Sequence, residues 1–188
     1  MAEENDEQNP LSTGSLLGDL PRTSPEDLKL MENERLSQKH YAAIGKVASE
    51  WAYLELVVDG YSAQLAKVEE SFGTCLTAQI SGIARKLEAH IALVRLRSGE
   101  FFAKRLNKFA VKARELSERR NRIVHDPWSI DENGFPHRYE ASARKIHKQQ
   151  MVYVSTSQVL LLYRDIEIAI DEFIALNKEI LAHVEPSP

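Results

Sequence analysis

Apolar residues recur every three or four positions over most of the chain beyond residue 40, which is the spacing that lines one face of an α-helix. Four stretches show this period, and they predict helices over about 41–65, 74–97, 100–124 and 155–182, with Gly73 as the limit of the first. Short segments connect them. The pattern predicts an all-α protein built as an antiparallel bundle of four to five helices.

Residues that start or stop helices agree with these limits. Ser98-Gly99 and Asp126-Pro127 follow the second and third stretches, and both pairs disfavour continuation of a helix. Ser155 and Gln158 form a capping box before the last stretch. Ser24-Pro25, followed by two acids, is a further helix start near the N-terminus.

Residues 129–154 lack the helical period. Asn133-Gly134 is a strong turn signal, and the segments 128–130 and 138–140 on either side are suited to pair around it. Residues 151–154 form another run typical of a strand. We therefore expect a short β-hairpin or irregular insertion before the last helix.

The domain organisation follows from composition. Residues 1–23 are polar, acidic and interrupted by proline and glycine, so we predict a mobile acidic tail followed by a single domain over 24–184. No apolar run approaches the roughly 20 residues of a membrane helix, and no secretory signal is visible, so a cytoplasmic protein is expected. Cys75 is the only cysteine; it excludes an internal disulfide, and we expect a small buried thiol.

Charge is distributed unevenly along the chain. The net charge is −4, yet residues 1–35 carry nine acids and three bases, whereas residues 104–122 carry eight bases and two acids. This basic region is either a surface for an anionic ligand such as RNA or a solvated helix face. Lys108, Lys112, Arg119 and Arg122 are its candidate RNA-binding residues.

Several kinds of chemistry find no support in the sequence. It contains no phosphate-binding glycine loop, no nucleophile elbow and no Glu-x-x-His pair on a predicted helix. The six histidines are scattered rather than closely paired. No metal and no cofactor is predicted.

The segment 118–128 carries the candidate site. Arg120 continues the apolar stripe of its helix, so its guanidinium needs an anion or a hydrogen-bond partner. Asn121 and His125 are four residues apart and share a helix face. A permanent cation, an amide and an imidazole that exchanges protons near neutral pH therefore converge at a helix end. This set suits metal-independent cleavage of RNA, in which the imidazole deprotonates a 2′-hydroxyl and the guanidinium stabilises the phosphate.

The Arg-x4-His spacing alone is not specific, because Arg35 with His40 and Arg85 with His90 also show it. Both of those pairs lie inside predicted helices, where five residues turn two side chains about 140° apart at ~100° per residue. Only Arg120 is followed by Asn and lies near a helix end.

Arg120-Asn121-x-x-x-His125, followed by a turn and Trp128, resembles the motif of the HEPN superfamily. The match is strong over 118–128, and the helix order over roughly 36–183 is compatible with it. The resemblance implies an endoribonuclease that leaves a 2′,3′-cyclic phosphate, in a toxin–antitoxin, phage-defence or RNA-processing system. It also implies a homodimer whose two motifs share one cleft, and a protein inhibitor or antitoxin as a candidate partner.

By the same resemblance, Arg120 would bind phosphate, His125 would be the base or acid, and Asn121 would orient them. In HEPN toxins controlled by adenylylation, a tyrosine stands two residues after the histidine; here that position is Pro127. The sequence therefore does not support a paired nucleotidyltransferase antitoxin.

Three alternatives stay open from the sequence. The chain is a catalytically silent HEPN-like module that binds a nucleotide, RNA or protein, or it is a plain structural bundle whose acidic tail binds a partner. Alternatively, Arg120 pairs with a core acid of the first long helix, for which the candidates are Glu50, Glu55 and Asp59. Trp51 and Trp128 are predicted as core residues rather than platforms for RNA bases.

Overall fold

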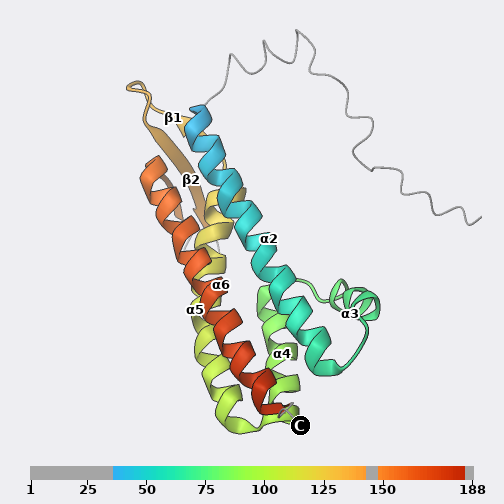
Figure 1. The fold of residues 1–188 in the computed structure, drawn as a ribbon. Coiled ribbons are helices and arrows are strands. Elements are labelled where there is room, and N and C mark those ends of the chain that lie inside the picture. The colour runs from blue at the N-terminus through green and yellow to red at the C-terminus, as the bar shows by residue number, and fades with distance from the viewer. Residues whose placement is uncertain (1–35, 143–147, 185–188) are drawn as a thin grey trace, which may run out of the picture. The chain divides into compact units, whose positions relative to one another are not determined.

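Helices make up most of the protein in the computed structural model, which describes residues 36–142 and 148–184 (Figure 1). Within these residues it has five helices and one three-stranded sheet: α2 (Gln38–Ala66), α3 (Glu70–Thr77), α4 (Ile83–Ser98), α5 (Glu100–His125), β1 (Trp128–Ile130), β2 (Pro136–Ser142), β3 (Lys148–Tyr153) and α6 (Thr156–Val184). The predicted tail over 1–23 and the helix start at 24–25 lie outside the described residues. The prediction of a mainly helical fold is confirmed.

The first long helix, α2, begins and ends at residues that the sequence identifies only in part. Ser37 caps its N-terminus by accepting a hydrogen bond from His40 N at 3.2 Å. Its C-terminal cap is Lys67, with a left-handed φ of 57°. The prediction that Gly73 limits this helix is therefore wrong, because the chain has already turned at Lys67 and Gly73 lies within α3.

The prediction of one helix over 74–97 is also wrong, because two helices, α3 and α4, occupy this region. Residues 78–82 separate them, and Gly82, with φ of +80°, adopts a conformation that other residues rarely take. Cys75, predicted to be buried, is exposed on α3.

Gly73 allows α3 to approach α2 closely. A Cβ atom at Gly73 would lie 2.5 Å from Ala63 Cβ, which is closer than two such atoms can approach. We therefore expect Gly73→Ala to lower the free energy of unfolding by about 1–3 kcal/mol, measured by urea denaturation. Gly45→Ala is the control, since nothing lies within 4 Å of a Cβ there. It should leave stability unchanged or raise it by up to about 1 kcal/mol; equal effects of the two variants would contradict the predicted clash.

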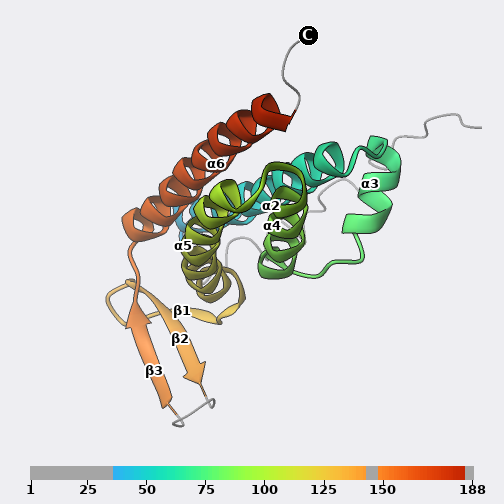
Figure 2. The ribbon, with the colours of Figure 1, turned by 90° about the horizontal axis from the view of Figure 1, so that it is seen from below.

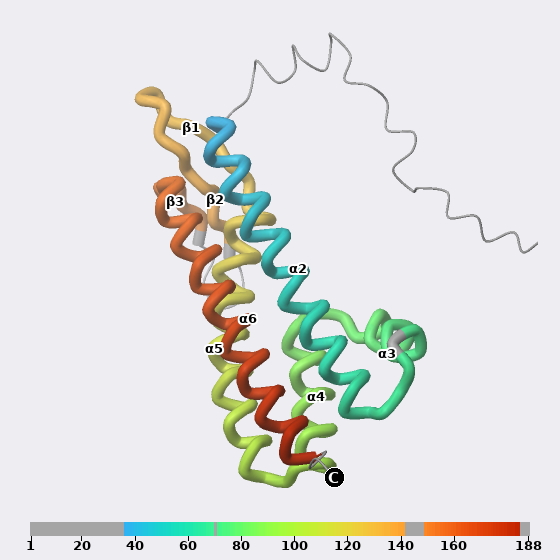
Figure 3. The backbone as a smooth tube through the Cα atoms, viewed as in Figure 1, coloured from blue at the N-terminus to red at the C-terminus, as the bar shows by residue number. Residues whose placement is uncertain are grey.

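Side-chain contacts define the directions of the packed helices. Arg105, Lys112 and Arg119 on α5 pair with Glu179, Glu172 and Asp165 on α6, so these two helices run antiparallel. By contrast, α2 and α6 begin at the same end: His40 Nδ1 lies 3.0 Å from Thr156 Oγ1 (Figure 3).

The pairs between α2 and α4 also advance together, because Asp59 bonds Lys86 and Ser62 bonds His90. An antiparallel arrangement thus holds for α5 and α6, whereas α2 runs parallel to α4 and α6. Residues 67–82, including α3, return the chain alongside the C-terminal part of α2, so that α4 can run in the same direction as α2. The helical period does not reveal this connection.

The core lies between α2, α4, α5 and α6. Its largest fully buried aromatic side chains are Phe109 and Phe173, whose ring centroids are 5.1 Å apart. Trp51 is 3% exposed and belongs to this core, as predicted. None of the described helices is both long and apolar enough to cross a membrane.

The predicted hairpin is present and is extended by a third strand, in the order β1-β2-β3. Asp131 Oδ1 accepts hydrogen bonds from Asn133 N and Phe135 N, and Gly134 takes φ of +79° in the turn. Trp128 pairs with Arg138 in the antiparallel register of β1 and β2. The sheet lies beyond the C-terminal end of α5 and leads into α6 (Figure 2).

Candidate functional site

The last turns of α5 bring together the three residues predicted for the site. Arg120 Nη1 lies 3.1 Å from Asn121 Oδ1 and 3.1 Å from His125 Nε2. His125 is the last residue of α5, and Asp126 continues as extended chain with ψ of 143°. His125 and Asn121 are exposed, and Arg120 is half-buried.

The hydrogen bond between Arg120 and His125 assigns the acceptor role to one nitrogen of the imidazole. A guanidinium only donates hydrogen bonds, so His125 Nε2 must accept with its lone pair. An accepting Nε2 corresponds to the tautomer with its proton on Nδ1. This arrangement holds a basic nitrogen beside a permanent cation at the protein surface.

Arg120 has no carboxylate partner among residues 36–142 and 148–184. Asp59, one of the acids proposed for it, pairs with Lys86 at 2.5 Å. Glu50, another, lies near Glu167 and Asp171, and burial followed by these two charges raises its pKa. The positive charge of Arg120 is therefore not neutralised by an ion pair in this part of the chain, and a bound anion would meet it directly.

The other two Arg-x4-His pairs form no such cluster. His90 is fully buried and bonds Ser62 and Asn177, whereas Arg85 is exposed. Arg35 lies outside the described residues. The sequence favours Arg120 with His125 over the other Arg-x4-His pairs, and the geometry of Arg85 and His90 agrees with this.

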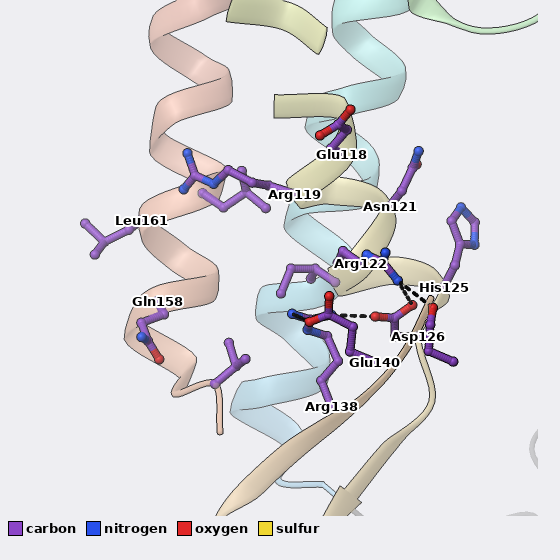
Figure 4. A pocket seen from close by; sticks show the side chains of 14 residues that line it. Glu118, Arg119, Asn121, Arg122, His125, Asp126, Arg138, Glu140, Gln158 and Leu161 are labelled. Atoms are coloured by element: carbon purple, nitrogen blue, oxygen red, sulfur yellow. Dashed lines mark hydrogen bonds and ion pairs between the residues drawn. The ribbon is translucent and has the colours of Figure 1, made fainter. Parts of the chain in front are cut away.

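A groove of about 930 Å³ lies beside the three residues, between the end of α5, strand β2 and the start of α6. Asn121 and His125 line one side of it. Arg122, Asp126, Arg138 and Glu140 occupy its centre, and Gln158 and Leu161 come from α6 (Figure 4).

An ion-pair network holds the sheet against the end of α5. Arg138 of β2 bonds Asp126 at 2.5 Å and Glu140 at 3.3 Å, and the Arg138 side chain is only 11% exposed. Arg122 reaches Asp126 at 3.5 Å. Local sequence patterns do not predict this network, because it depends on the register that places Arg138 opposite Trp128.

Trp128 closes the end of α5 as a packed residue. Its Nε1 donates to Ile123 O at 2.9 Å, and its ring meets the edge of buried His40 at 4.7 Å between centroids. Burial lowers the pKa of His40, which favours its neutral ring in this contact. Trp128 is half-buried against the core, as predicted, and is not a free stacking platform.

The four predicted RNA-binding residues differ in their surroundings. Arg119 bonds Asp165 at 2.8 Å, and Lys112 bonds Glu172 at 2.6 Å. Lys108 is exposed, and Arg122 lines the groove. Lys112 and Arg119 therefore stabilise the contact between α5 and α6, and only Arg119 and Arg122 border the groove.

Among the described residues, no three His, Cys, Asp or Glu side chains come together in a way that would hold a metal ion. No protein-family model, curated protein or solved structure matches the chain.

Proposed function

We propose that the protein is a metal-independent endoribonuclease of the HEPN type. The observation that supports this most directly is the guanidinium of Arg120, 3.1 Å from the accepting Nε2 of His125 and without a carboxylate partner in the described residues. A base that can deprotonate the 2′-hydroxyl and a cation that can stabilise the phosphate both promote cleavage of an RNA phosphodiester.

In the proposed reaction, His125 Nε2 takes the proton of a ribose 2′-hydroxyl. The 2′-oxygen forms a bond to the adjacent phosphorus, and the bond from phosphorus to the 5′-oxygen breaks. The products are a 2′,3′-cyclic phosphate and a 5′-hydroxyl, whose proton comes from an imidazolium or from water. Before this proton transfer, Arg120 turns its donors from His125 Nε2 to the phosphate oxygens, which frees the Nε2 lone pair, and Asn121 guides the guanidinium through its 3.1 Å contact.

The packed helices would form a HEPN-like bundle, two copies would associate so that both motifs share one cleft, and Arg119, Arg122, Lys108 and Lys112 would contribute to RNA binding. The protein would act in the cytoplasm, in a toxin or phage-defence system, with a protein inhibitor as a further candidate partner.

The test is cleavage of mixed RNA by purified protein in EDTA, with analysis of the RNA ends. We expect fragments with 2′,3′-cyclic phosphates from the wild type. His125→Ala should lower the rate constant on the order of 10²-fold, since general-base catalysis contributes at least that much. His183→Ala is the control, because His183 is exposed near the end of α6.

Two results would count against this function. If the wild type and every variant leave the RNA intact, and RNA binding persists in His125→Ala, the protein is a silent binding module instead. Cleavage that is equally fast in His125→Ala and in the wild type would show that His125 is not the base.

A further inference from the structure

The groove beside His125 is lined by charged side chains of both signs as well as by apolar ones. Three arginines line it, and so do three carboxylates; these residues are Arg119, Arg122, Arg138, Glu118, Asp126 and Glu140. Arg138 is held by two of the carboxylates, and Arg119 is held by Asp165 outside the groove. Among the described lining residues, positive and negative side chains are equal in number, so this set alone is poorly suited to attract phosphate.

One exposed apolar side chain lies at the groove where α6 begins, above two buried ones. Leu161 is 58% exposed at the groove, with Leu162 and Val154 beneath it. An apolar surface beside hydrogen-bonding groups fits the flat face and polar edge of a nucleobase. The volume of about 930 Å³ falls in the range of roughly 300–1,000 Å³ usual for ligand sites.

Gln158 presents a hydrogen-bond donor whose orientation is determined. Its Oε1 accepts from Ser155 N at 2.8 Å and from Ser155 Oγ at 3.2 Å, as the capping box of α6 requires. The amide therefore cannot exchange its oxygen and nitrogen without losing the cap. Nε2, with its two N–H groups, is left for another acceptor at the groove.

We propose that this groove binds a nucleobase of single-stranded RNA and that Gln158 Nε2 selects bases with a carbonyl oxygen. The inference rests on the proposed function for its substrate class. In Figure 4, His125 and Gln158 are separated by Arg122, Asp126, Arg138 and Glu140. The selected base therefore belongs to a nucleotide near the cleaved bond, and not to one that this bond joins directly. Uracil, with two carbonyl oxygens, is favoured over adenine, which has none.

Gln158→Glu tests the inference with little change to the fold. Glutamate also completes a capping box, so the cap of α6 is retained while the donor becomes an acceptor. The measurement is the affinity of the full-length protein for 2′-O-methyl oligouridine and 2′-O-methyl oligoadenosine, by fluorescence anisotropy. We expect the wild type to prefer oligouridine and the variant to lose this preference, with the affinity ratio falling about tenfold.

Ser157→Glu adds the same charge at the neighbouring exposed position, so it should weaken both oligonucleotides alike and keep their ratio. An unchanged ratio in Gln158→Glu, or an equal shift in Ser157→Glu, would overturn the inference. The probes lack a 2′-hydroxyl and cannot be cleaved, so the result does not depend on catalysis. A shifted ratio without any RNA cleavage would refute the proposed nuclease and retain the base site.

Discussion

Arg120→Ala should lower the rate constant of RNA cleavage on the order of 10³-fold, the largest effect that we expect of any single substitution. The guanidinium is the cation in contact with His125, at 3.1 Å, and donors that stabilise charge on the reacting phosphate contribute about this much. Before RNA binds, it also positions the His125 ring through its 3.1 Å contact with Nε2. Single-turnover cleavage of a defined RNA in EDTA measures the loss.

Arg120→Lys separates the charge of the side chain from its geometry. Lysine keeps the positive charge but lacks the planar pair of donors, so it should recover only a small part of the rate. Arg114→Ala is the matched control: Arg114 is exposed on the same helix and does not line the groove. A loss in Arg114→Ala as large as that in Arg120→Ala would indicate a general effect of charge on RNA binding. A fully active Arg120→Lys would show that a point charge is sufficient.

The contact between Arg120, Asn121 and His125 was predictable because it is local. All three residues lie within two turns of one helix, and Asp126-Pro127 ends that helix directly after the histidine. Helical spacing and a terminating pair place Asn121 and His125 on one face at the helix end, whereas the contact of Arg120 with His125, five residues away, depends on the reach of the long arginine side chain. The hairpin was predictable for the same reason, since Asn133-Gly134 specifies its turn.

The surroundings of this contact depend on residues distant in sequence. Arg138 meets Asp126 only through the register of β1 and β2, and the pairing of Arg119 with Asp165 depends on the packing of α5 against α6. The helical period also does not show that Gly82 divides one predicted helix into two. These features arise from tertiary packing, so local patterns carry little information about them.

Acid should destabilise the protein through His90, a group that the function does not use. Its ring is fully buried between α2 and α6: Nε2 lies 2.8 Å from Asn177 Oδ1, and Nδ1 lies 2.9 Å from Ser62 Oγ. Burial lowers the pKa of His90 to about 4, although the hydrogen bond to Asn177 opposes this. The folded protein therefore keeps the ring neutral at a pH where the unfolded chain would take up a proton.

The direction of the pH effect follows from this difference. Above a pH of about 6.5, the histidine is neutral in both states and its burial has no titration cost. As the pH falls from about 6.5 to about 4, His90 takes up a proton in the unfolded state but not in the folded state. The free energy of unfolding should then decrease by about 3 kcal/mol over this interval.

Urea unfolding at several pH values between 7.5 and 4 measures this loss, and His90→Gln isolates it. Glutamine retains an amide that can bond Asn177 and Ser62 but does not titrate, so the variant should be less stable at pH 7 and lose less stability on acidification. His183→Gln changes an exposed position, so its free energy of unfolding should depend on pH as in the wild type. If His90→Gln does not fold, the ring carbon shifts of His90 in the wild type report its pKa directly. A pKa near 6.5 for that ring, or equal pH slopes for wild type and His90→Gln, would show that the buried network accommodates an imidazolium.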